Sequence, residues 1–256
     1  MLAAGMSPFV IALLAVTALF AGTVDAIAGG GGLITLPALL TAGVPTELAF
    51  GTNKGQSVWG AGAAMLAFWR AGKVDRRLAL GMFPLALVGS AIGARLVLLI
   101  DKDALKPIVI AMLIGAAVLL MLKKPTRDED LDQTPRHRAT ALVLAFVIAA
   151  YDGFFGPGTG TFLIVGFVAL CGKSMTRATA DAKVVNFASN IAALATFAQA
   201  GAVMWAVSLP MAAGQLLGGV IGARLAIRGG ARLIRILVLV VSGALVAKLG
   251  YDLLPG

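Results

Sequence analysis

The chain has 256 residues, of which 59% are hydrophobic and 13% are charged, with a formal net charge of +9 and one cysteine. A soluble domain of this length could not bury so much apolar surface, and a single cysteine excludes an internal disulfide and a cysteine-based metal cage. The lysines and arginines lie in short loops between apolar segments, as the positive-inside rule produces, which argues against nucleic acid as a partner. The composition therefore predicts an all-α polytopic membrane protein in a lipid bilayer.

Apolar segments follow one another along the chain in two sets of five. They span 8–28, 32–43, 46–69, 78–100 and 104–122, then 139–156, 160–171, 175–200, 205–227 and 231–250. Most are near the roughly 20 residues that a spanning helix needs, but 32–43 and 160–171 are too short. Both short segments follow a glycine-rich break, so we predict that each is a broken or re-entrant half-helix. The polar stretch 123–138 is a linker between a first half, 1–122, and a second half, 139–256.

The glycine-rich breaks lie at residues 29–32 and 156–160, and Asp25 and Asp152 precede them. In a bilayer, irregular backbone is tolerated only where it is buried in protein or lines a watery cavity. A helix that begins after a break exposes unpaired N–H groups, and glycine lets an anion approach them closely. Duplication of the break favours a site. Close helix packing is the alternative role, and we predict it for the pairs Gly51/Gly55, Gly89/Gly93 and Gly218/Gly222.

The two halves of the sequence repeat. At an offset of 127 residues, Asp25, Gly29 and Gly31 align with Asp152, Gly156 and Gly158. At an offset of 129 residues, Lys54 aligns with Lys183. Five segments per half is an odd number, so the second half should enter the membrane in the opposite direction. Basic residues crowd the loop at 70–77, whereas its equivalent near 201–203 has none. We therefore predict two inverted repeats of about five segments each, with both termini external and the linker cytoplasmic.

Segments 46–69 and 175–200 carry polar residues at helical spacing. Lys183, Asn186 and Asn190 share one helical face, and Lys54 and Ser57 take matching positions in the first half. A lysine inside an apolar segment is costly unless it has a partner or a cavity. We therefore predict a cationic substrate site. The alternatives are that each lysine snorkels to the interface, or that it pairs with an aspartate at 25, 152 or 181.

The predicted substrate-binding set joins the glycine breaks to the polar residues of these two segments: Gly30, Gly31, Gly32, Asn53, Lys54, Ser57, Gly158, Thr159, Gly160, Lys183, Asn186 and Asn190. Asp25 and Asp152 could cap local N–H groups, balance the lysines, or bind a coupling proton or sodium ion. The one histidine, His137, lies in the linker, and the chain lacks a nucleophile elbow and a phosphate-binding loop. We therefore expect neither an enzyme nor a cofactor.

At these residues the sequence resembles the sulfite exporter TauE/SafE family of bacterial membrane transporters. The resemblance covers nearly the whole chain and rests on DAIAGGGGLITLP at 25–37, GTNK at 51–54, GARL at 93–96 and 222–225, and GPGTG at 156–160. It implies a multi-helix inner-membrane transporter of small anions, sulfite or organosulfonates, usually moved outward. It also implies that the breaks and the central polar residues form the site.

The second break differs from the first, because Pro157 and Thr159 stand where the first has Gly30 and Gly32, and Ala182 falls on Asn53. We therefore expect the substrate to bind closer to the polar residues of the second half than to those of the first. The expected function is secondary transport of a small sulfur-containing anion by alternating access. A passive anion channel and a non-transporting membrane scaffold or subunit are the alternatives, and a homo-oligomer is compatible with the sequence.

Overall fold

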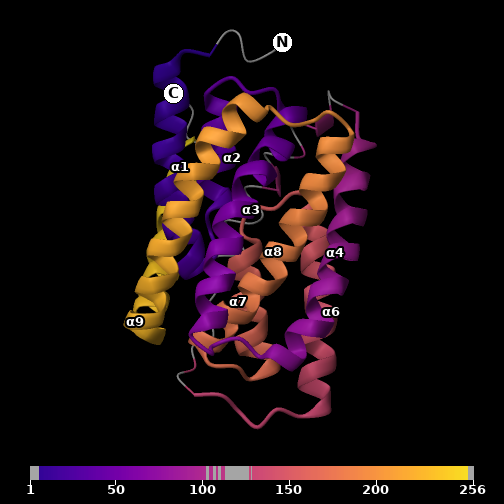
Figure 1. Ribbon diagram of the computed structural model, residues 1–256, viewed down its shortest axis with the longest axis vertical. Helices are drawn as coiled ribbons and strands as arrows, with labels where there is room; N and C mark the ends of the chain where they lie inside the picture. Colours follow the sequence, from indigo (N-terminus) through magenta and orange to yellow (C-terminus); the bar gives the residue numbers. More distant parts are fainter. Residues whose placement is uncertain are drawn as a thin grey trace.

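The structure, a computed structural model, describes residues 6–101, 104, 105, 108, 111, 112, 127 and 129–252, with only the backbone of 230–252. This part of the chain contains helices and no strand, which confirms the all-α prediction (Figure 1). The helices are α1 Pro8–Ala28, α2 Gly32–Thr41, α3 Thr46–Arg70, α4 Arg76–Leu98, α6 Pro135–Phe154, α7 Thr159–Cys171, α8 Met175–Gln199 and α9 Trp205–Asp252. Most of the segment predicted at 104–122, and residues 123–126 and 128 of the linker, lie outside the described residues.

Capping side chains set where several helices begin. Ser7, Asp75 and Ser174 each accept a hydrogen bond from a backbone N–H in the first turn of α1, α4 and α8. At α6, Thr134 forms a capping box with His137. Helix α6 therefore begins inside the stretch 123–138 that we predicted as a linker, because residues 135–138 already belong to it. The prediction located the apolar stretch, whereas the cap starts the helix one turn earlier.

Three of the described helices are long and apolar enough to cross a membrane: Pro8–Ala28, Arg76–Leu98 and Trp205–Gly229. The short helices α2 and α7 begin at or next to the residues predicted for the half-helices. The backbone is helical from Trp205 to Asp252, so the two segments that we predicted at 205–227 and 231–250 form one continuous helix. Two consecutive glycines at 229 and 230 disfavour a helix without forbidding it.

The helices form two outer pairs around a central pair (Figure 1). α1 packs on α9, and α4 packs on α6. Between them, α3 contacts α8 and α9, and α8 contacts α4. The short helix α2 lies against α1 and α3, and α7 lies against α6 and α8. The polar helices α3 and α8 therefore occupy the middle of the bundle, where apolar helices shield them.

Glycines bring the outer helices into backbone contact. A Cβ on Gly89 or Gly93 of α4 would lie 2.4 or 1.9 Å from a carbonyl oxygen of α6. A Cβ on Gly218 or Gly222 of α9 would lie 2.1 or 2.3 Å from a carbonyl oxygen of α1. These distances leave no room for a side chain, so the predicted packing role of these glycines is confirmed.

Two hydrogen bonds join the halves at opposite ends of the bundle. The N–H of Asp75, before α4, donates to Asp181 Oδ1 at 2.9 Å, and Lys173 pairs with Asp181 there. The N–H of Met204, before α9, donates to Thr52 Oγ1 at 3.0 Å. In the sequence register Asp75 falls on Met204 and Thr52 on Asp181. The inverted repeat stays our interpretation of this correspondence.

The end of the linker is fastened to the start of α8. Asp130 accepts a hydrogen bond from the N–H of Ser174 at 2.6 Å and pairs with Arg177 at 3.4 Å. Partial burial by itself raises the pKa of Asp130, but the Ser174 hydrogen bonds and the Arg177 charge together lower it below its ordinary value.

The contact between α4 and α6 can be tested with two substitutions on one helix. Gly93→Ala places a methyl group against the Ala150 carbonyl, whereas Gly81→Ala meets only the flexible end of Leu142 at 2.9 Å. Both gain the same helix propensity, so the difference reports packing. We expect Gly93→Ala to be less stable than Gly81→Ala by about 1–3 kcal/mol, measured by thermal unfolding in detergent. Equal melting temperatures would contradict the close contact.

Candidate functional site

The two glycine breaks touch each other in the middle of the bundle. Gly29 ends α1 with φ of 81° and donates its N–H to Asp25 O at 2.8 Å. A Cβ on Gly29 would lie 2.2 Å from the carbonyl carbon of Gly160, and Thr161 Oγ1 donates to Ala28 O at 2.8 Å. The end of α1 therefore meets the start of α7 backbone to backbone, which only glycine permits at this distance.

The second break requires glycine for a different reason. Gly156 and Gly158 have φ of 96° and 86°, in the left-handed region that side chains disfavour. Tyr151 donates its hydroxyl hydrogen to the carbonyl of Pro157 at 2.6 Å, which holds the turn from the side of α6. The chain can therefore leave α6 at Phe154 and re-enter a helix at Thr159 within four residues.

Two ion pairs cross between the halves. Lys54 Nζ on α3 lies 2.8 Å from Asp152 Oδ1 on α6, and Lys183 Nζ on α8 lies 2.9 Å from Asp25 Oδ2 on α1. The lysine side chains are 3% and 0% exposed, so they do not snorkel to an interface. Each pairs with an aspartate, as one of our alternatives predicted. The third aspartate of that alternative, Asp181, pairs with Lys173.

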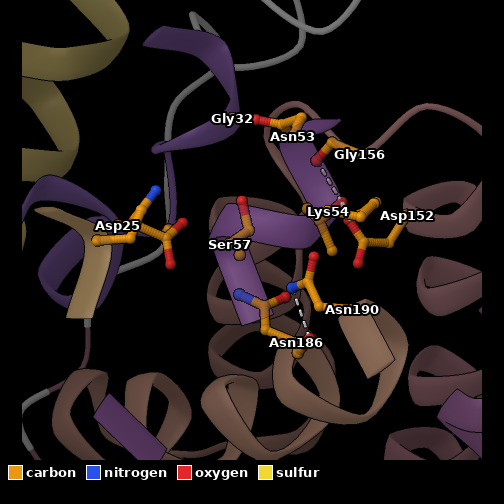
Figure 2. A pocket seen from close by; sticks show the side chains of 13 residues that line it. Asp25, Gly32, Asn53, Lys54, Ser57, Asp152, Gly156, Asn186 and Asn190 are labelled. Atoms are coloured by element: carbon orange, nitrogen blue, oxygen red, sulfur yellow. Dashed lines mark hydrogen bonds and ion pairs between the residues drawn. The ribbon is translucent and has the colours of Figure 1, made fainter. Parts of the chain in front are cut away.

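A small polar pocket lies between these ion pairs (Figure 2). Figure 2 shows Asp25 on one side of it and Lys54 with Asp152 on the other. Of the predicted residues, it is lined by Asp25, Gly32, Asn53, Lys54, Ser57, Asp152, Thr159, Gly160, Asn186 and Asn190. Gly30, Gly31, Gly158 and Lys183 are not among the lining residues, although Lys183 reaches the pocket indirectly through Asp25.

Hydrogen bonds orient the amide side chains of the pocket. Asn53 Oδ1 accepts from Thr35 Oγ1 at 2.6 Å and from Gln56 Nε2 at 2.9 Å, which leaves its NH₂ group to donate to a ligand. Asn190 Nδ2 donates to the carbonyl of Asn186 at 2.7 Å. Asn186 Oδ1 is buried and has no hydrogen-bond partner among the described residues, so it needs a donor from water or a ligand.

Three lining residues are not in the predicted substrate-binding set: Gly29, Gly156 and Gln215. The two glycines belong to the predicted breaks, whereas the sequence analysis missed Gln215. Gln215 lies on α9, and its Oε1 is the nearest atom to a Cβ built on Gly22 or on Gly60. A polar amide inside an apolar segment is a signal that could have identified Gln215. The repeat hid it, because the matching residue of the first half is Ala86.

Both aspartates balance a lysine, and Asp25 also accepts the N–H of Gly31 at 3.2 Å, in the first turn region of α2. Asp152 accepts from Thr159 Oγ1 at 2.9 Å and from Ser189 Oγ. The counter-charge role that we considered is therefore observed for both aspartates, and capping of a local N–H group is observed for Asp25. Binding of a coupling ion at Asp25 or Asp152 stays a prediction.

Comparison with known proteins agrees with this architecture. The model of the sulfite exporter TauE/SafE family matches residues 14–249. The chain is 42% identical to the probable membrane transporter protein ORF9 of a Sinorhizobium species over 94% of this chain and 93% of that protein. It is 39% identical to the probable membrane transporter protein YfcA of Escherichia coli K12, over 96% and 92% of the two chains. No solved structure gives a significant match. The chain therefore belongs to the sulfite exporter TauE/SafE family and is a multi-pass membrane transporter.

Proposed function

We propose that the protein is a secondary transporter, chiefly an exporter, of a small sulfur-containing anion such as sulfite or an organosulfonate. One observation carries the proposal: a buried lysine and amide donors line a pocket where two broken helices cross inside an apolar bundle. Broken helices that aim their N-termini at a central substrate are a recurring transporter arrangement. The family description names sulfite, which supports this class of anion.

The donors of the pocket suit an anion with several oxygens. Lys54 offers an ammonium group, Asn53 offers its free NH₂ group, and α2 and α7 begin at the pocket wall with their partial positive charge. A sulfite or sulfonate group presents three oxygens, each of which can accept from one of these donors. Lys54 is already paired with Asp152, so the anion would bind to an existing ion pair and not to an unpaired cation.

The end contacts suggest how access could alternate. The Asp75–Asp181 contact and the Met204–Thr52 contact each join one half of the chain to the other, at opposite ends of the bundle. Opening one contact while the other stays closed would expose the pocket to one side of the membrane at a time. A passive channel would instead need both ends open together, and a scaffold or subunit would need no pocket. We also propose that the protein lies in the bacterial inner membrane with external termini and a cytoplasmic linker.

Flux measurements separate these alternatives. Purified protein in lipid vesicles should take up labelled sulfite with a saturable rate, and vesicles preloaded with unlabelled sulfite should show counterflow. Counterflow requires a site that returns across the membrane loaded, which a pore cannot do. Flux without saturation or counterflow would favour the channel. If neither flux nor anion-specific thermal stabilisation occurs with sulfite, sulfonates, sulfate or carboxylates, the scaffold alternative replaces the proposal.

The Asn53 side chain tests whether the pocket holds the anion. Asn53→Asp keeps the size of the side chain but replaces the free donor with a carboxylate oxygen, which repels an anion. We expect at least a roughly tenfold weaker affinity, the effect of losing a hydrogen bond to a charged group. Gln199→Glu, which adds the same charge at an exposed position of α8, should bind as the unchanged protein does. Equal affinities in both variants would place the anion elsewhere.

Single cysteines test the orientation. In a Cys171→Ala background, Glu129→Cys should react with a membrane-impermeant maleimide only after intact cells are permeabilised, because the linker is predicted to be cytoplasmic. Glu129 is exposed, and the neighbouring contacts of Asp130 stay intact. Ala3→Cys should react in intact cells. Reaction of both cysteines from the same side would contradict the inverted repeat.

A further inference from the structure

The two aspartates of the pocket have matching places in the chain but different surroundings. Asp152 has three donors within reach: Lys54 at 2.8 Å and the Thr159 hydroxyl at 2.9 Å on one oxygen, and the Ser189 hydroxyl on the other. The Thr159 hydroxyl also lies 2.6 Å from the carbonyl oxygen of Gly156. Its side chain is 5% exposed. Asp25 accepts from Lys183 and from one backbone N–H, and its side chain is 22% exposed, toward the pocket that it lines. Asp25 is thus the more exposed and the less hydrogen-bonded of the two carboxylates that line the pocket.

The sequence explains this difference. Thr159 falls on Gly32 in the first half, and Ser189 falls on Gly60. Both hydroxyl groups that donate to Asp152 are therefore absent on the side of Asp25. At Gly60 the space that a side chain would occupy is filled by Gln215, whose Oε1 lies 2.7 Å from the position of a Cβ.

The charges around Asp25 come from few elements. Lys183 of α8 contacts Asp25 directly, and Lys54 of α3 and Asp152 of α6 lie across the same pocket. The other described helices at the pocket, α2, α7 and α9, face it with residues that do not titrate: Gly32, Thr159, Gly160 and Gln215. The two lysines and two aspartates sum to zero charge, so a bound anion would leave one uncompensated negative charge in a medium of low dielectric constant.

We propose that a monovalent anion binds together with one proton, that the proton goes to Asp25, and that Asp152 stays ionised. The inference rests on the proposed anion site and names its coupling ion. The proton converts the Asp25 carboxylate to a neutral carboxyl group, and Lys183 then balances the anion. A sodium ion fits less well, because the Lys183 ammonium already occupies both the side-chain and the backbone oxygen of Asp25. A cycle of this kind is electroneutral, so its direction follows the anion and proton gradients and not the membrane potential.

Calorimetry counts the proton directly. The probe is methanesulfonate, which carries one negative charge throughout the pH range used. Titrations at about pH 7 in two buffers with different heats of ionisation give the number of protons taken up per bound anion. We expect one proton for the unchanged protein and a tenfold loss of affinity per pH unit on raising the pH. Asp25→Asn, which mimics the protonated side chain, should bind with no proton uptake. Glu129→Gln, the control, removes an exposed carboxylate that does not line the pocket and should still take up one.

Several results would overturn the proposal. These are anion binding without proton uptake in the unchanged protein, uptake that persists in Asp25→Asn, or an affinity that falls when choline replaces sodium. If Asp25→Asn does not fold, Gly32→Ser replaces it, because it supplies Asp25 with the hydroxyl that Thr159 supplies to Asp152, and a Cβ there lies 3.4 Å from its nearest neighbour. Its proton uptake should fall, and unchanged uptake would contradict the proposal. No binding of sulfite or of any sulfonate at any pH would instead refute the proposed function itself.

Discussion

Two buried ammonium groups have to be neutralised inside an apolar bundle, and the way this is done determines how the chain is assembled. An unpaired charge at this depth costs several kcal/mol, whereas a paired and hydrogen-bonded one can be tolerated. Lys54 joins α3 to α6, and Lys183 joins α8 to α1. Four helices that are far apart in the sequence are therefore held around one point. The pocket is the space that remains between the two ion pairs.

Glycine makes this arrangement sterically feasible. The breaks can cross because Gly29 and Gly160 approach through their backbones, and the outer pairs α1–α9 and α4–α6 close because carbonyl groups rest on bare Cα atoms. Contacts of this kind have no flexible side chain that could adjust to a change in distance. The outer pairs should therefore move as stiff bodies, and the movement that transport requires falls to the more polar contacts at the two ends of α3 and α8.

Much of the fold could be predicted from hydropathy and glycine placement. The starts of α1, α2, α3 and α8 and the half-helix character of α7 follow from where apolar sequence begins after a break or a cap. The start of α6 could not be located in this way, because a capping box at Thr134 extends the helix into polar sequence. Most residues of the pocket were predicted, but the partner of each lysine was not. The sequence alone offered several aspartates and no information on which one lies beside which lysine. Gln215 was missed because it has no counterpart in the repeat.

The crossing of the ion pairs has a consequence for the ancestry of the chain. Each half contributes one cation and one anion, yet neither pairs with its own half. On our inverted-repeat interpretation, a half-length protein with the same contacts would have stable charges only when a second copy lay beside it in the opposite orientation. Such an ancestor would be an antiparallel homodimer inserted into the membrane in both directions. Duplication and fusion of its gene would remove the need for dual insertion, and would allow the two carboxylates to acquire different neighbours.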